Sequence, residues 1–169
     1  MPFLESIGLK AIEEILHRLF ELRPRRFVIK VPESGHTLTP GQPYKEGYLY
    51  PVQGELSRLT PGHEIWMLTQ NITTHEAWPQ SPATGYAPES HVWNGTVYPG
   101  PGPKKIRIVA VVAPPTSQML FRYYKNLYSV GAQKAPPLPD IPLECRVTAC
   151  VDVNVPKTEY DVMKHGTGR

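Results

Sequence analysis

The stretch LECRVTACVDVNV, residues 143–155, decides the fold class, because apolar and polar side chains alternate along its whole length. A period of two residues is typical of a strand with one buried face and one solvated face. The buried face would carry Leu143, Cys145, Val147, Ala149, Val151, Val153 and Val155. The stretch therefore predicts the closing strand of an antiparallel sheet. It also predicts that Cys145 and Cys150 lie on opposite faces and form no disulfide.

A second hydrophobic stretch, KKIRIVAVVA at residues 104–113, predicts a central strand covered on both faces. Shorter strands are expected at 27–31, 47–56, 64–70 and 91–100. Within 47–56, Pro51 cannot donate to a sheet ladder and Gly54 indicates a bulge or bend. We therefore expect 47–56 to be an edge strand.

Two of these strands carry further signals. In EIWMLTQ, residues 64–70, Trp66 and Leu68 share one face, which we expect to enter a core. In the strand at 91–100, the dipeptide Asn94-Gly95 indicates a tight hairpin turn or, alternatively, a bulge.

The N-terminal residues 3–22 have apolar side chains at three- and four-residue steps, which predicts an amphipathic helix ending before Pro24. The apolar face would present Leu4, Ile7, Ile15, Leu19 and Leu22. A face of this width is costly to leave in water. We expect it to bind a protein partner, to self-associate or to pack on its own domain.

A second helix is expected at 116–130, with Thr116 as its N-cap and Gly131 at its end. Its core stripe would consist of Leu120, Tyr123, Leu127 and Val130. The segment PPLPDIP at 136–142 follows as a stiff crossover, although its P-x-x-P spacings would also suit an aromatic partner groove.

The chain has 169 residues, enough for one ordinary domain with an appendage. Its 20 prolines and 13 glycines require many turns between short elements, which favours a mainly β fold. We expect an N-terminal helix at 1–26, an antiparallel β-sandwich with one helix before its last strand at 27–156, and a polar tail at 157–169.

Composition excludes several classes of protein. The formal net charge is only +3, with both signs mixed along the chain, so no nucleic-acid partner is expected. No apolar run has membrane-spanning length, so no transmembrane segment is expected. With two cysteines and no cleavable signal pattern, the expected location is cytoplasmic.

The dipeptide His-Glu occurs twice in HEIWMLTQNITTHEAW, at 63–64 and 75–76, but neither copy has a second histidine four residues later. The spacing of a helical zinc site is therefore missing. We expect no catalytic residues, no metal and no cofactor. The alternative is a ligand-sensing or metal-binding pocket in the 63–93 region, built from His63, His75, His91, Glu76 and the nearby tryptophans.

The connection at 70–90 is long, and long connections on a rigid sheet often bind ligands. Core packing accounts for Trp66 and Trp93, but it does not account for Trp78. A small-ligand loop is therefore predicted from Trp78, His75, Glu76 and Tyr86.

The order of the motifs VPESG at 31–35, GYLYPVQGEL, PGHEIWMLTQ, AWPQ at 77–80, VWNGTVYPG and KKIRIVAVVA resembles a type of bacterial immunoglobulin-like β-sandwich module. The resemblance covers about residues 27–155. It implies a sandwich of about seven strands that serves as a binding, adaptor or sensory unit and brings no catalytic residues. The helix at 116–130 and the N-terminal helix depart from a minimal sandwich of this type.

The function expected from these features is a non-catalytic interaction or adaptor module. It would bind a protein partner, or another copy of itself, through the N-terminal helix. Two alternatives stay open at this point. One is the ligand-sensing or metal-binding domain, and the other is a structural subunit of a larger assembly.

Overall fold

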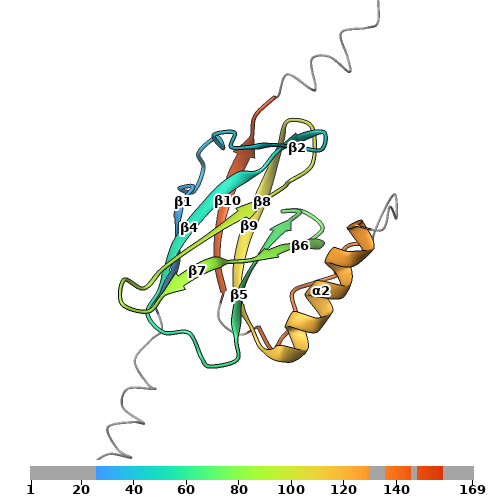
Figure 1. Ribbon diagram of the computed structural model, residues 1–169. Helices are drawn as coiled ribbons and strands as arrows, with labels where there is room; N and C mark the ends of the chain where they lie inside the picture. The colour runs from blue at the N-terminus through green and yellow to red at the C-terminus, as the bar shows by residue number, and fades with distance from the viewer. Residues whose placement is uncertain (1–25, 130–135, 146–147, 158–169) are drawn as a thin grey trace, which may run out of the picture.

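The computed structural model describes residues 26–129, 136–145 and 148–157, which form two four-stranded antiparallel sheets, a small hairpin and a helix (Figure 1). The first sheet has the order β1 (Phe27–Val31), β4 (Tyr50–Leu56), β8 (Val92–Val97) and β7 (Thr84–Ala87). The second has the order β10 (Thr148–Val155), β9 (Lys104–Ala113), β5 (Glu64–Gln70) and β6 (Ala77–Pro82). The hairpin consists of β2 (Pro43–Tyr44) and β3 (Gly47–Tyr48), and the helix is α2 (Pro115–Ser129). The expected mainly β, sandwich-like fold is confirmed.

The main core lies between the two sheets. The first sheet contributes Phe27, Tyr50, Val52, Leu56, Trp93 and Val97. The second contributes Ile65, Met67, Ile106, Ile108, Ala110, Val112, Ala149, Val151, Val153 and Val155. The alternation predicted for the last strand is therefore confirmed from Ala149 onward, where each second residue of β10 is buried in this core.

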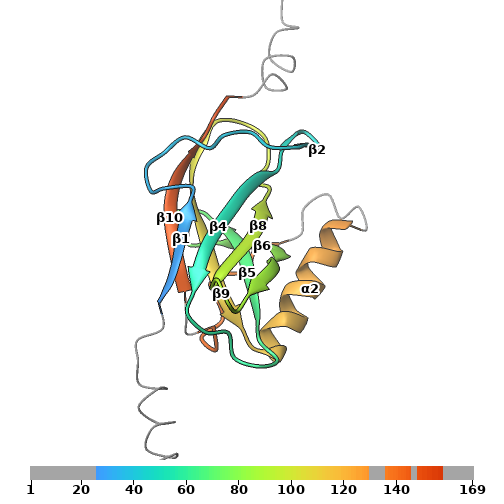
Figure 2. The same ribbon diagram turned by 60° about the vertical axis from the view of Figure 1, so that its left-hand side comes forward.

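A second apolar cluster lies on the other face of the second sheet. It contains Trp66, Leu68, Ala77, Val109, Val111, Ala113, Phe121, Leu138 and Cys145. Figures 1 and 2 show α2 alongside this sheet, next to β5 and β6. β9 is consequently buried on both faces, as its sequence predicts. β5 is also buried on both faces, although its sequence predicts that only one face enters a core.

The prediction that residues 47–56 form an edge strand is wrong, because β4 pairs with both β1 and β8. Pro51 is tolerated there because it lies beyond the last β1 pair, Val31 with Gln53. Gly54 pairs regularly with Trp93 on β8, whereas the pairing of β4 with β1 shifts its register beside Gly54, between Ile29 and Val31 of β1.

The expected turn or bulge at Asn94-Gly95 is also absent, since both residues continue β8 opposite β4. The glycine is needed for a different reason. A Cβ atom on Gly95 would collide with the thioether end of Met67 from the opposite sheet. Glycine is therefore required at this position because the two sheets lie close together, and the dipeptide does not mark a reversal of the chain.

The stripe predicted for the second helix is wrong for Leu120 and Tyr123, while Leu127 is partly buried and Val130 lies outside the described residues. Leu120 is 37% exposed and Tyr123 is 60% exposed, while Ser117 and Phe121 face the sheet. The helix begins at Pro115, one residue before the expected cap. Its inner face is partly polar near this end, because the Gln118 amide donates to the carbonyl oxygens of Gly62 and Ala113. A search for apolar residues at three- and four-residue steps cannot detect a helix face that is buried but partly polar.

The last strand begins at Thr148, later than its sequence predicts. Leu143 is 91% exposed, and Cys145 lies in the cluster beneath α2. These two residues are therefore not part of the strand, which corrects the prediction for both. Cys145 is buried, Cys150 is exposed, and both thiols are free, as expected.

The two outer strands of the second sheet, β10 and β6, form backbone hydrogen bonds with segments that do not belong to the sheet. On β10, the carbonyl of Asp152 accepts from Gly35 N–H, and Asn154 exchanges hydrogen bonds with His36 and Leu38. On β6, Ala77 exchanges two hydrogen bonds with Leu138.

The predicted N-terminal helix face of Leu4, Ile7, Ile15, Leu19 and Leu22 lies outside the described residues. Most of the polar tail also lies outside them. Within 26–129, 136–145 and 148–157, no helix has both the length and the apolar content needed to cross a membrane.

Candidate functional site

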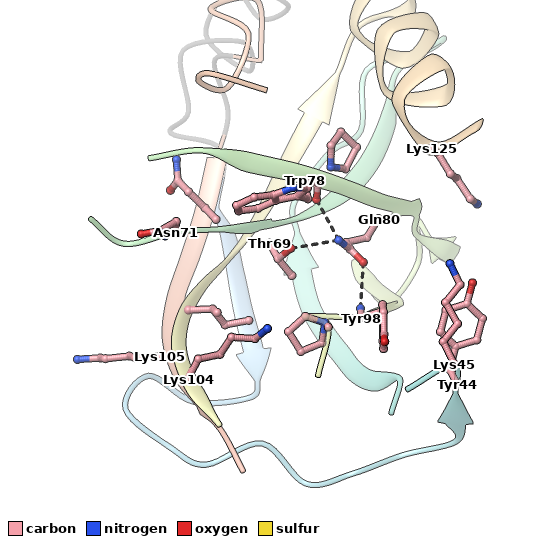
Figure 3. A pocket seen from close by; sticks show the side chains of 15 residues that line it. Tyr44, Lys45, Thr69, Asn71, Trp78, Gln80, Tyr98, Lys104, Lys105 and Lys125 are labelled. Atoms are coloured by element: carbon pink, nitrogen blue, oxygen red, sulfur yellow. Dashed lines mark hydrogen bonds between the residues drawn. The ribbon is translucent and has the colours of Figure 1, made fainter. Parts of the chain in front are cut away.

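A cavity of about 570 Å³ opens where the main core reaches one end of the two sheets. We call it the mouth cavity. It is lined by Tyr44, Lys45, Thr69, Gln70, Asn71, Trp78, Pro79, Gln80, Tyr98, Pro99, Gly100, Lys104, Lys105, Ile106 and Lys125 (Figure 3). Ile106 belongs to both the core and the cavity wall, so the cavity continues the core outward. Its volume is in the range of small-molecule sites.

The side chain of Gln80 connects three of the segments that line the mouth cavity. Its Nε2 donates to Thr69 Oγ1 and to the carbonyl of Trp78, each at 3.1 Å. Its Oε1 accepts from the Tyr98 N–H at 3.0 Å. These dashed bonds in Figure 3 link β5 and β6 to the residue that follows β8. Gln80 therefore fixes the shape of the cavity and has little capacity left for a ligand.

Three aromatic side chains line the mouth cavity, and they come from separate parts of the chain. Trp78 lies on β6 opposite Thr69, and its indole ring points into the cavity in Figure 3. Tyr44 and Tyr98 pack edge to face, with ring centroids 5.2 Å apart. Trp66 and Trp93 are fully buried, whereas Trp78 is partly exposed. Trp78 is thus the tryptophan that a ligand can reach.

Four lysines surround these rings, and no aspartate or glutamate lines the cavity. Lys104 Nζ donates to the Pro101 carbonyl at 3.0 Å. For Lys45, Lys105 and Lys125, no described residue offers a carboxylate within ion-pair distance. Same-sign charges around a concave apolar surface raise the local concentration of ligands of opposite charge. The mouth cavity is therefore suited to anions.

Lys45 is placed by the turn between β2 and β3. Its φ of 50° is in the left-handed region, which costs a residue with a side chain about 1 kcal/mol. The Nζ atom lies 5.3 Å from the ring centre of Tyr44, in cation–π contact. Backbone strain of this kind is often found at functional sites.

The four residues of the predicted ligand loop are not brought together. Trp78 lines the mouth cavity, but His75, Glu76 and Tyr86 do not. The carbonyl of His75 accepts from Gln70, and a Glu76 carboxylate oxygen accepts from the Thr74 hydroxyl. The Tyr86 hydroxyl donates to the carbonyl of Leu56, at the end of β4. The expected loop at 70–90 is in large part the strands β6 and β7.

The alternative metal site is not assembled either. Across the part of the chain that the structure describes, no three side chains of His, Cys, Asp or Glu are close enough to hold a metal ion. His63 Nδ1 contacts the Pro61 carbonyl, and His75 and His91 occupy left-handed turn positions. These three histidines are polar residues of turns and strand ends.

The groups with shifted pKa values lie outside the mouth cavity. The Arg107 guanidinium donates to both oxygens of Asp152, at 2.7 and 3.2 Å, and this lowers the pKa of that carboxyl. Burial raises the pKa of the Cys145 thiol. Both features stabilise or shape the fold and do not face a cavity that a ligand could enter.

Sequence reasoning found Trp78 but missed the lysines. Lys104 and Lys105 begin the most hydrophobic strand, which is interpreted through its apolar residues and their burial. Lys45 and Lys125 are 80 residues apart in the numbering and meet only through the fold. Comparisons with protein-family models, curated proteins and solved structures found no match to this chain. The chemistry of the mouth cavity is therefore the guide to function.

Proposed function

We propose that this protein is a non-catalytic module that binds a small anionic ligand with a flat ring in the mouth cavity. The observation that carries the proposal is the lining itself, with four lysines, three aromatic side chains and no carboxylate. The lysines supply charge attraction, and the aromatic rings supply an apolar surface for a planar group.

The polar groups of the cavity also support binding over catalysis. Apart from the lysines, they are amides, hydroxyls and the Trp78 indole N–H. General bases and nucleophiles are most often histidine, carboxylate or cysteine side chains, although lysine and tyrosine also act in these roles. The lining contains lysines and tyrosines but no histidine, carboxylate or cysteine, and in our proposal the lysines bind the charge of the ligand.

We further propose that the fold is of the immunoglobulin-like type. In that fold, strands A, B, E and D form one sheet, and strands C, F and G, extended by C′ in the variable type, form the other. If β1 and β4 to β10 are lettered A, B, C, C′, D, E, F and G, the two sheets have the orders ABED and GFCC′. In this arrangement α2 is an insertion between F and G. Cross-strand NMR contacts that gave another order would contradict the assignment.

The binding proposal is tested by calorimetric titration with 1-naphthyl phosphate, a probe that combines a flat ring with an anion. We expect a dissociation constant below 1 mM, and at least a tenfold loss of affinity in the variant Lys45→Ala/Lys104→Ala/Lys105→Ala. Arg58→Ala is the control for the loss of a single exposed positive charge, because Arg58 is exposed in the connection between β4 and β5 and does not line the cavity. Binding that the triple variant leaves unchanged contradicts the proposal.

The interactions expected through the N-terminal segment stay predictions. Self-association through Ile15 and Leu19 predicts an oligomer that Ile15→Asp/Leu19→Asp converts to a monomer in light scattering. A role as a structural subunit predicts polymers of the concentrated protein in electron micrographs.

A further inference from the structure

The ring of Trp78 provides a surface on which a ligand ring can stack. The residue is held firmly, since it pairs with Thr69 and its carbonyl accepts from Gln80. Its indole remains partly exposed inside the mouth cavity, while Trp66 and Trp93 are fully buried. A nucleobase stacks well on an exposed tryptophan, because every base has a flat π face.

The lysines lie around this ring on three separate elements. Lys104 and Lys105 begin β9, Lys45 lies in the β2–β3 turn, and Lys125 lies on α2. In Figure 3 the side chains of Lys104 and Lys105 lie on one side of Trp78 and those of Lys45 and Lys125 on another. Each of these two sides therefore offers two lysines, and either pair matches a ligand group with several negative charges, such as a diphosphate, which lysine binds as a point charge.

Two hydrogen-bond donors at the cavity have no partner among the described residues. The Trp78 indole Nε1–H makes no hydrogen bond to them. The Asn71 Oδ1 accepts from the Thr73 and Thr74 N–H groups, which leaves the Nδ2 donors of this amide unused. Nucleobases and sugars offer ring nitrogens, carbonyl oxygens and hydroxyls as acceptors for such donors.

We propose that the ligand of the mouth cavity is a free nucleoside diphosphate or triphosphate. The base stacks on Trp78, and the phosphates lie among the lysines. This assignment rests on the proposed function and names the ligand class for the same site. The cavity volume of about 570 Å³ suits one such molecule, since drug-sized ligands occupy sites of this size.

The test compares four probes by calorimetry at fixed ionic strength: ADP, adenosine, pyrophosphate and a ten-residue oligothymidylate. We expect ADP to bind at least tenfold tighter than adenosine or pyrophosphate, because only ADP uses both the ring and the lysines. Trp78→Ala should weaken ADP at least tenfold and leave pyrophosphate within twofold. Trp78→Phe, which keeps a flat ring, should retain most of the ADP affinity.

A second set of variants tests the proposal even if a substitution at Trp78 prevents the protein from folding. Lys105→Ala and Lys125→Ala change exposed side chains, and each should weaken ADP and pyrophosphate by a similar factor. Arg58→Ala should change neither. Circular dichroism and the melting temperature show that each variant is folded.

The outcomes separate the nucleotide assignment from the general binding proposal. If 1-naphthyl phosphate binds but ADP is no tighter than pyrophosphate, the nucleotide assignment is overturned and anion binding stands. If the oligothymidylate binds tighter than ADP, a single-stranded nucleic acid replaces the free nucleotide, which also overturns the assignment. If none of the anions binds, both proposals fall.

Discussion

Gly54 lies directly against the indole ring of Trp93, the residue with which it pairs between β4 and β8. A Cβ atom on Gly54 would collide with this ring and with the carbonyl oxygen of Val28 on β1. Both neighbours are rigid, one a fully buried ring and the other a backbone atom. Trp93 therefore depends on a glycine at position 54 to enter the core.

Gly54→Ala is expected to lower the free energy of unfolding by about 3 kcal/mol, at the upper end for an overpacked core. Gly95→Ala is the matched comparison, because the atoms nearest to its new methyl group belong to the flexible side chain of Met67. We expect a smaller loss there, about 1 kcal/mol. Urea denaturation of both variants measures the difference. Equal losses would contradict the role assigned to the rigid ring.

Asp152→Asn is expected to reduce stability by about 1 kcal/mol near pH 7, because it removes a cross-strand ion pair with Arg107. The pKa of Asp152 is lower in the folded protein than in the unfolded chain. The contribution of the pair is therefore present above the unfolded value of about 3.9, and it is lost as the pH falls through the folded pKa. Denaturation from pH 7 to pH 2 should show the two proteins converging at the acid end. A difference that does not decrease as the pH falls contradicts this assignment.

Glu64→Ala is expected to cost about 2 kcal/mol, since it leaves the buried indole N–H of Trp66 without its acceptor. Glu64→Gln keeps an acceptor at 2.9 Å and should cost less. Arg122→Ala removes the ion pair to Glu64 at an exposed site and should cost below about 1 kcal/mol. Thermal denaturation ranks the three variants. The expected order fails if Arg122→Ala is the most damaging.

One thiol of the native protein is expected to react rapidly with a disulfide reagent at pH 8. Cys150 is exposed, whereas Cys145 is buried and its raised pKa leaves little thiolate. Cys150→Ser should abolish the rapid phase, and Cys145 should react only when the protein is unfolded by urea. Two rapid thiols in the native protein would show that the segment before β10 opens readily.

Iodide is expected to quench the fluorescence of one tryptophan. Trp66 and Trp93 are fully buried, and Trp78 is surrounded by lysines that attract the anion. Relative to the quenching of free N-acetyltryptophanamide by each ion, quenching by iodide should therefore exceed quenching by caesium, and Trp78→Phe should remove most of it. A nucleotide bound in the mouth cavity should protect Trp78. Equal quenching by the two ions would argue against a positive potential at this tryptophan.

The parts of the fold that followed from sequence are those set by a repeating pattern. The alternation in 149–155 and the continuous apolar run in 108–113 predict their strands directly, because each pattern reflects one local environment. The errors arose where a residue type has two physical meanings. Gly54 and Asn94-Gly95 resemble bulge or turn signals, but they serve close packing against Trp93 and Met67.

The candidate site was predictable only in part. Trp78 stood out because no core position explained it, and the structure places it in the mouth cavity. The surrounding lysines come from a hairpin, a strand and a helix, so no local spacing connects them. The mixed charge of the whole chain also hides a local cluster of one sign. Such a site becomes visible only when the fold brings distant segments together.

The hydrogen bonds from Gly35, His36 and Leu38 to β10, and from Leu138 to β6, limit how copies of this protein can join. An incoming strand would need the backbone groups that these segments already occupy. Among the described residues, strand addition between copies would accordingly be directed to β7, because β1, the other outer strand of the first sheet, lies beside β10. Deleting residues 35–38 would leave backbone N–H and C=O groups of β10 without partners. Aggregation into fibrils would be the first observable result.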